Sequence, residues 1–338
     1  MQITRRRLLM SLGTLAASLK PPGLMAAPAS LARFDFSEPH MGTMFKIVLY
    51  APDPDLAAAA SRAAFDRIAA LDRIMSDYDE TSELMRLCRA AGGPAVEISA
   101  DLCRVMTAAQ ELSRRSDGAF DITVGPVVQL WRRARRRHEL PEPDRLAAAR
   151  GLVGYGNVHL DPKNQRAELR KPGMLLDLGG IAKGDAADQA LLVLERYHIT
   201  QALIAAAGDI ATGDPPPGRD WEIGIETFES PALPPSRFIG LHDRAVSTSG
   251  DSEQHVEIGG VRYSHIVDPK TGMALTGRRS VTVTAPHGIT ADCYATALCV
   301  LGHERGLRLI RDTPGTAALI TEEDSGAIHE YHLPNFLR

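Results

Sequence analysis

Two hydrophobic periods occur along the chain, and together they predict a mixed α+β fold. Apolar residues spaced three and four apart between Ala64 and Met75 predict a helix with one buried face. Short apolar runs rich in β-branched residues predict strands. These runs are Phe45–Tyr50, Ala202–Ala206, Trp221–Ile225, Phe238–Leu241, Val281–Thr284 and Ala318–Thr321. Since neither a repeat nor a linker interrupts the pattern, we expect a single α+β domain.

Capping residues and glycines predict where the helices begin and end. Asp55 is expected to cap the first helix, which ends near Ser76, and Ser99 to cap a second helix over Asp101–Arg115. A last helix covers about Ala291–Leu301, with Gly302 as its stop. Val158–Leu160 and Ala167–Leu169, joined across a polar turn, are typical of a hairpin.

The stretch Leu175–Asp188 predicts a strand end, a tight turn and the start of a helix that continues to about Tyr197. Free backbone N–H groups gather at such a helix start and bind anions. Gly179 and Gly180 allow close approach of a ligand, and Lys183 adds a charge suited to phosphate. The stretch is not a Walker A loop, because Ala182 and Gly184 replace its glycine and its Ser/Thr. A purely structural turn is the alternative.

The first 29 residues are expected to be a signal peptide rather than part of the fold. A twin-arginine start at Thr4–Leu9 precedes the apolar run Leu8–Leu19 and the A-P-A sequence Ala27–Ala29, which predicts cleavage after Ala29. The mature domain then covers residues 30–338 in the periplasm. An uncleaved membrane anchor is the alternative, although the apolar run is short for a span.

Cleavage would leave 34 basic against 42 acidic residues, a net charge of −8. An acidic chain argues against nucleic acid as the partner. The exception is the basic run Arg132–His138, which is typical of a solvated face, with a lipid surface or an acidic partner as the alternative. The four cysteines fit no metal spacing; a Cys88–Cys103 disulfide is left open, while Cys293 and Cys299 lie on different helical faces.

Several polar positions could support chemistry. Asp292 and Thr296 lie one helical turn apart, and their two oxygens suit Mg²⁺ or Ca²⁺ better than zinc. His265, before a D-P-K-T-G turn, is a candidate proton acceptor near neutral pH. The hydroxyl-rich turn Ser247–Asp251 could bond phosphate or its own backbone, and Gly208-Asp209 forms another glycine–carboxylate corner. Each of these residues also has a purely structural interpretation.

Seven segments in one order resemble the ApbE-type flavin transferase family, the FAD:protein FMN transferases, over about Met41 to Gly302. They are M-G-T at Met41–Thr43, M-S-D-Y-D-E-T-S-E at Met75–Glu83, G-A-F-D-I-T-V-G-P-V-V-Q-L-W at Gly118–Trp131, D-L-G-G-I-A-K-G at Asp177–Gly184, S-T-S-G-D at Ser247–Asp251, H-I-V-D-P-K-T-G at His265–Gly272 and D-C-Y-A-T-A-L at Asp292–Leu298.

The resemblance implies a T-fold-like α+β domain that cleaves FAD and passes FMN to a Ser or Thr hydroxyl of a partner flavoprotein, with Mg²⁺ and release of AMP. The partner would be a subunit of a redox membrane complex or a periplasmic FMN-binding domain, which leaves room for association with the inner membrane. By the family's motifs, Asp292, Thr296 and the Ala182 carbonyl would bind the metal, and His265 would be the base. The FAD site would comprise Met41, Tyr78, Ala119, Phe120, Asp121, Gly179, Lys183, Asp185 and Ile266.

Two other functions use the same residues. A periplasmic FAD pyrophosphatase would give FMN and AMP, with water in place of the protein hydroxyl. A non-catalytic FAD-binding protein would need neither the metal nor the histidine, which the presence of Asp292, Thr296 and His265 disfavours.

Overall fold

An eight-stranded antiparallel sheet is the centre of the computed structural model, which describes residues 31–216, 218–225, 235, 237–250, 254–333 and 336. The predicted signal peptide, residues 1–29, and its cleavage site lie outside the described residues. In spatial order the strands are β1 (Ala32–His40), β2 (Thr43–Ala51), β6 (Ala202–Ala206), β7 (Asp209–Thr212), β10 (Ala245–Gly250), β14 (Arg279–Ala285), β15 (Ala317–Asp324) and β16 (Ala327–His332).

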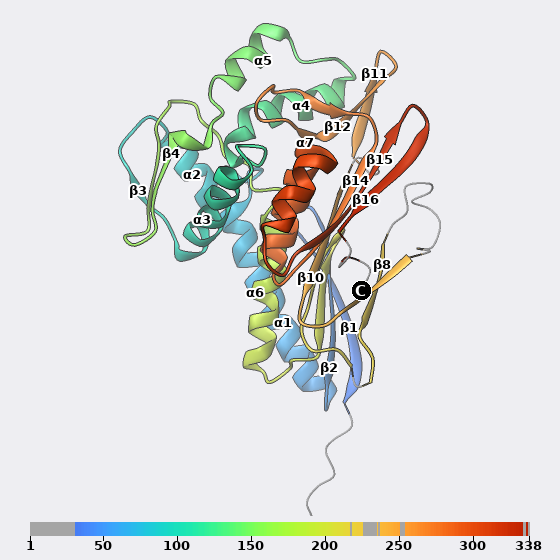
Figure 1. The fold of residues 1–338 in the computed structure, drawn as a ribbon. Coiled ribbons are helices and arrows are strands. Elements are labelled where there is room, and N and C mark those ends of the chain that lie inside the picture. Colours follow the sequence, from blue (N-terminus) through green and yellow to red (C-terminus); the bar gives the residue numbers. More distant parts are fainter. Residues whose placement is uncertain are drawn as a thin grey trace, which may run out of the picture. The chain divides into compact units, whose positions relative to one another are not determined.

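Three long helices cover one face of this sheet: α1 (Pro54–Met75), α6 (Ala182–Arg196) and α7 (Gly288–Arg311) (Figure 1). Their buried faces are rich in alanine, which lets α6 pack closely between α1 and α7. Helix α3 (Ala100–Arg115) packs against α1 and α7. The expected stop at Gly302 is a break rather than an end, since its φ of 71° and ψ of 179° interrupt α7 and the chain then resumes helical geometry to Arg311.

The N-cap of the first helix lies two residues before the predicted one. Asp53, not Asp55, is the N-cap, because its Oδ1 accepts the backbone N–H of Leu56 at 2.8 Å. Pro54 follows at the first helical position, where its missing N–H costs nothing. Ser99 caps α3 as predicted.

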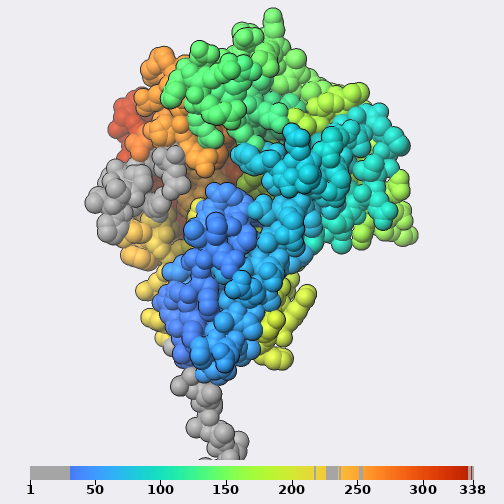
Figure 2. Space-filling view, turned by 180° about the vertical axis from the view of Figure 1, so that it is seen from behind, coloured from blue at the N-terminus to red at the C-terminus, as the bar shows by residue number. Residues whose placement is uncertain are grey.

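Smaller sheets complete the fold. Strands β8 (Trp221–Ile225) and β9 (Arg237–Leu241) form a hairpin whose apolar residues pack with those of β2, β10 and β15 in a second core. Strands β3 (Val96–Glu97), β5 (Arg166–Leu169) and β4 (Val158–Asp161) form a sheet near α2 (Glu83–Arg89) and α3. Strands β11 (His255–Ile258), β12 (Val261–Val267) and β13 (Ala274–Thr276) pack against α4 (Gly125–Arg137), which contacts α5 (Pro143–Arg150). Figure 2 shows these green helices beside the orange strands.

The mixed α+β architecture and all six predicted strands are confirmed, each to within a few residues at its ends. Two further predictions from local pattern were wrong. Leu175 and Leu176 lie outside every sheet that the structure describes. Ser247–Ser249 belong to strand β10 rather than to a turn, because β14 pairs with all three residues and β7 pairs with Ser247; Asp251 lies outside the described residues.

The structure also bears on the cysteines and on membrane-spanning helices. All four cysteines are buried and free, so Cys88 and Cys103 form no disulfide. Within the described ranges, no helix combines the length and the hydropathy that a membrane span requires.

Candidate functional site

A cavity of about 900 Å³ lies where α6 and α7 meet α4, β8, β10 and β12. This volume is at the upper end of the range for small-molecule sites. Twelve of the thirteen residues predicted for the site line it: Met41, Tyr78, Ala119, Phe120, Asp121, Gly179, Ala182, Lys183, His265, Ile266, Asp292 and Thr296.

Asp185 is the exception: it does not line the cavity, and its assignment to the FAD site was wrong. Its carboxylate is buried and accepts two hydrogen bonds from Arg104 of α3, at 2.9 and 2.8 Å. Residues two apart on a helix are about 200° apart around its axis. Because Lys183 faces the cavity, Asp185 faces α3 instead, and its charge joins α6 to α3.

Close backbone contact between α6 and α7 brings the site's residues together. A Cβ at Gly184 would lie only 2.2 Å from the carbonyl oxygen of Gly288, so no side chain larger than hydrogen fits there. A Cβ at Gly180 would lie 2.8 Å from the Oγ1 of Thr296. Gly180 and Gly184 therefore allow the start of α6 to lie in close contact with α7.

The start of α7 has no cap of its own, and α6 supplies one. The two oxygens of Asp188 accept the N–H groups of Gly288 at 2.6 Å and Ile289 at 2.9 Å. Burial raises the pKa of Asp188 to about 6, although both hydrogen bonds act to lower it. This contact fixes the first turn of α7, from which Asp292 projects one turn later.

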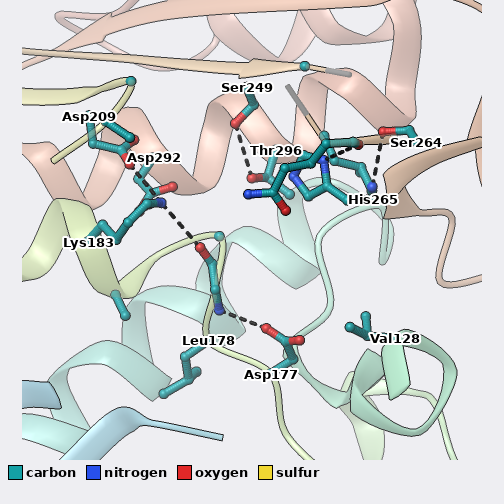
Figure 3. Close-up of a pocket in the computed structure, with 18 of the residues that line it drawn as sticks. Val128, Asp177, Leu178, Lys183, Asp209, Ser249, Ser264, His265, Asp292 and Thr296 are labelled. Carbon is teal, nitrogen blue, oxygen red and sulfur yellow. Dashed lines mark hydrogen bonds and ion pairs between the residues drawn. The ribbon is translucent and has the colours of Figure 1, made fainter. Parts of the chain in front are cut away.

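A cluster of three charged side chains lies on the cavity wall beneath α7 (Figure 3). The Nζ of Lys183 is 2.7 Å from Asp209 and 3.9 Å from Asp292, and both carboxylates are buried. The Oδ2 of Asp292 also accepts the N–H of Gly184 at 3.0 Å. Burial, and after it the charge of Asp209, raises the pKa of Asp292 to about 7. When both carboxylates are ionised, the single ammonium leaves the cluster with a net charge of −1.

This donor set fits a hard divalent cation. Asp292 supplies a buried carboxylate, and the hydroxyl of Thr296 lies on the same helical face of α7. Ala182, whose carbonyl is the predicted third ligand, lines the same cavity. Across the part of the chain that the structure describes, no group of three or more His, Cys, Asp or Glu side chains is placed to hold a metal. A cation here would thus depend on hydroxyl and carbonyl oxygens beside the Asp292 carboxylate.

His265 reaches the cavity from strand β12, whose position is fixed by α4. The backbone N–H of His265 donates to the carbonyl of Gln254, and its Nδ1 lies 3.1 Å from the same oxygen. Beyond the strand, the indole N–H of Trp131 donates to the carbonyl of Gly272 at 2.9 Å. Its ring also packs against Tyr263, with centroids 5.2 Å apart. Helix α4 therefore anchors both sides of the segment that contains His265.

Arg132 is a cavity residue that sequence reasoning missed. It forms ion pairs with Asp77 and with Asp177, the latter at 2.8 Å. Its guanidinium also lies 4.4 Å from the ring centroid of Tyr78, whose side chain is exposed at the cavity. The run of arginines suggested a solvated face, and no local pattern separates Arg132 from its neighbours, because its partners are 55 and 45 residues away.

Asp121 lines the cavity, but its carboxylate is already engaged. It accepts the N–H and the hydroxyl of Thr123 at 2.9 and 2.6 Å, and the N–H of Tyr155 at 2.7 Å. Burial raises its pKa despite these bonds. Asp121 therefore shapes the cavity wall by closing the turn before α4.

The fold and the cavity define a flavin transferase scaffold. The chain superposes on the solved structure of the flavin transferase ApbE from Vibrio cholerae with a TM-score of 0.80 and 28% identity, over 90% of this chain and 98% of that one. The sequence model of the ApbE family matches residues 41–320, and the chain belongs to this family.

Curated relatives agree. A Haemophilus influenzae protein named FAD:protein FMN transferase is 34% identical over 302 residues, which cover 85% of this chain and 86% of the relative. A Treponema pallidum protein of the same name is 31% identical over 332 residues, covering 93% and 91%.

Proposed function

We propose that this protein transfers FMN from FAD to a Ser or Thr hydroxyl of a partner protein, with release of AMP and dependence on Mg²⁺. The observation that supports it most is the convergence of four features in one cavity: the oxygens of Asp292 and Thr296, the ammonium of Lys183, the start of α6 and the imidazole of His265. Membership of the ApbE family supports the same activity.

The reaction is a displacement at the phosphorus of the FMN half of FAD. The acceptor oxygen forms a bond to that phosphorus, the bond to the bridging oxygen breaks, and AMP leaves with that oxygen. The proton of the acceptor hydroxyl passes to His265. A positioned base of this kind contributes about 10²–10⁴ in rate.

Charge neutralisation is the other requirement, because phosphoryl-type transfer depends mainly on positioning and electrostatics. Lys183 and the N-terminus of α6 would bind the pyrophosphate oxygens. Asp292, Thr296 and the Ala182 carbonyl would hold Mg²⁺, which neutralises charge on the pyrophosphate when bound. The charge cluster supports this, since it carries a net charge of −1 without a cation when both of its carboxylates are ionised.

The test combines FAD, Mg²⁺ and the protein with or without a periplasmic FMN-binding domain, and measures AMP and acceptor mass. We expect AMP release coupled to an FMN adduct, and no adduct on an acceptor whose target Thr is replaced by Ala. AMP without an adduct would instead indicate a pyrophosphatase, and neither product an FAD-binding protein.

A variant series in the same assay tests the base. His265→Ala should retain FAD binding and slow transfer by about 10²–10⁴. His159→Ala is the matched control, because His159 is exposed on β4 and does not line the cavity. Equal rates for the two variants would remove His265 from the mechanism.

We also propose that the protein acts outside the cytoplasmic membrane. The support is the twin-arginine start and the A-P-A sequence of the first 29 residues. The acceptor would then be a periplasmic FMN-binding domain or the periplasmic face of a redox membrane complex.

A further inference from the structure

Lys183 lies between two carboxylates and is closer to one of them than to the other. Its ammonium is in contact with Asp209 at 2.7 Å and stands off from Asp292 at 3.9 Å. It also lies 3.4 Å from the carbonyl of Gly179. If the ammonium of Lys183 formed a direct ion pair with Asp292, it would occupy the carboxylate that the proposed Mg²⁺ site requires. The ammonium and Mg²⁺ are both cations and would compete for the same carboxylate oxygens.

Asp209 is itself held in a fixed orientation. Its Oδ1 accepts the hydroxyl proton of Ser247 at 2.5 Å, and both side chains are buried. The backbones of the two residues are partners across β7 and β10. Asp209 therefore presents its other oxygen, Oδ2, to Lys183 from a rigid part of the sheet.

The same strand supports the other ligand. Ser249 lies two residues beyond Ser247 on β10, so both side chains are on one face of the sheet. The Oγ of Ser249 is 3.5 Å from the Oγ1 of Thr296. The hydroxyls of Ser247 and Ser249 thus contact groups around the proposed cation, whereas the hydroxyl of Thr248 contacts that of Thr282 at 3.0 Å.

We propose that Asp209, oriented by Ser247, is a positioning residue that keeps the ammonium of Lys183 away from Asp292. In this arrangement Asp292 stays available to a divalent cation while Lys183 stays beside it at the cavity wall. The inference rests on the proposed metal site at Asp292 and Thr296. Without the charge of Asp209, the ammonium moves onto Asp292 and competes with the cation.

The test is a double-mutant cycle on Mn²⁺ binding to FAD-free protein, measured by the loss of the free Mn²⁺ signal in electron paramagnetic resonance. Asp209→Asn should weaken Mn²⁺ affinity about tenfold, within the range of couplings between contacting residues. In a Lys183→Met background the same substitution should cost less than about threefold, because no ammonium is left to release. Asp66→Asn, an exposed change on α1, is the matched control and should have no effect.

A simple loss of one negative charge predicts a different result. Asp209→Asn would then cost the same factor in both backgrounds, and that outcome would overturn the inference while leaving the metal site intact. Wild-type Mn²⁺ affinity in Asp292→Asn would overturn the metal site, and with it the inference. Ser247→Ala keeps every charge and gives a second test should Asp209→Asn not fold. It should weaken Mn²⁺ binding by about threefold with Lys183 present and leave it unchanged in Lys183→Met; no loss with Lys183 present would contradict the proposal.

Discussion

Replacing Gly184 by alanine should separate α6 from α7 and disorder the charge cluster. The added Cβ would lie 2.2 Å from the carbonyl oxygen of Gly288 and 2.8 Å from the Cβ of Asp292. Ordinary van der Waals contact begins at 3.4 Å, so the backbones must move apart by more than 1 Å. Rotation of a side chain cannot relieve either contact, because the first atom is backbone and the second is the Cβ of a buried residue.

The expected loss of stability follows from three terms. Overpacking of a tight core contact costs about 1–3 kcal/mol. The hydrogen bond from the N–H of Gly184 to Asp292 and the cap from Asp188 to the start of α7 would lengthen, at about 0.5–1.5 kcal/mol each. Alanine has a higher helix propensity than glycine, which offsets about 1 kcal/mol of this loss. The net expectation is a destabilisation of about 1–5 kcal/mol.

Urea unfolding at neutral pH measures this difference. Gly156→Ala is the matched control, because a Cβ at that position would have no atom within 4 Å and its φ is not positive; it should change stability by less than about 0.5 kcal/mol. The Gly184 variant should also bind Mn²⁺ more weakly, since Asp292 is displaced. If Gly184→Ala is as stable as wild type or more stable, helix propensity outweighs the contact and the explanation given for this glycine is wrong.

Three further predictions concern the cap, the anchor of His265 and export. Burial raises the pKa of Asp188 from 3.8 to about 6, so the folded protein binds this proton more tightly than the unfolded chain does. The stability of wild type relative to Asp188→Asn should therefore fall as the pH rises from about 4 to about 6. Urea unfolding at several pH values measures this difference, and a difference that does not change with pH would contradict the raised pKa. Trp131→Phe leaves the buried carbonyl of Gly272 without its donor and should lower the free energy of unfolding by about 1–3 kcal/mol; an unchanged value would show that the hydrogen bond contributes nothing. Changing Arg5 and Arg6 to Lys should retain the protein in the cytoplasm in a cell-fractionation assay, and normal export would contradict the twin-arginine assignment.

Local sequence determined most of the elements, because their causes act within a few residues. Apolar runs predicted six strands, and helical spacing, caps and glycines predicted α1, α3, α6 and the first part of α7; Ser99 was correctly identified as a cap. The limits of this reasoning are also local. The cap of α1 was displaced by two residues because Asp53 and Asp55 are equally good caps in sequence, and only the bond to Leu56 distinguishes them.

The residues of the site were also predicted only in part from the sequence. The family's motifs placed thirteen residues in the predicted site, and twelve of them line the cavity. The error at Asp185 arose because a motif places neighbours together, whereas a helix turns alternate residues to opposite sides. Its partner Arg104 is 81 residues away, so no pattern near Asp185 indicates which side it faces.

Only the tertiary structure decided which charges meet. Gly184 reaches Asp292 across 108 residues, Asp188 caps a helix that starts 100 residues later, and Ser247 holds Asp209 across 38. The sequence by itself specified the supply of carboxylates, hydroxyls and glycines and the elements that present them. It left their pairing open, because the energy of an ion pair or a tertiary cap depends on distances and burial that exist only after α6, α7 and β10 have packed.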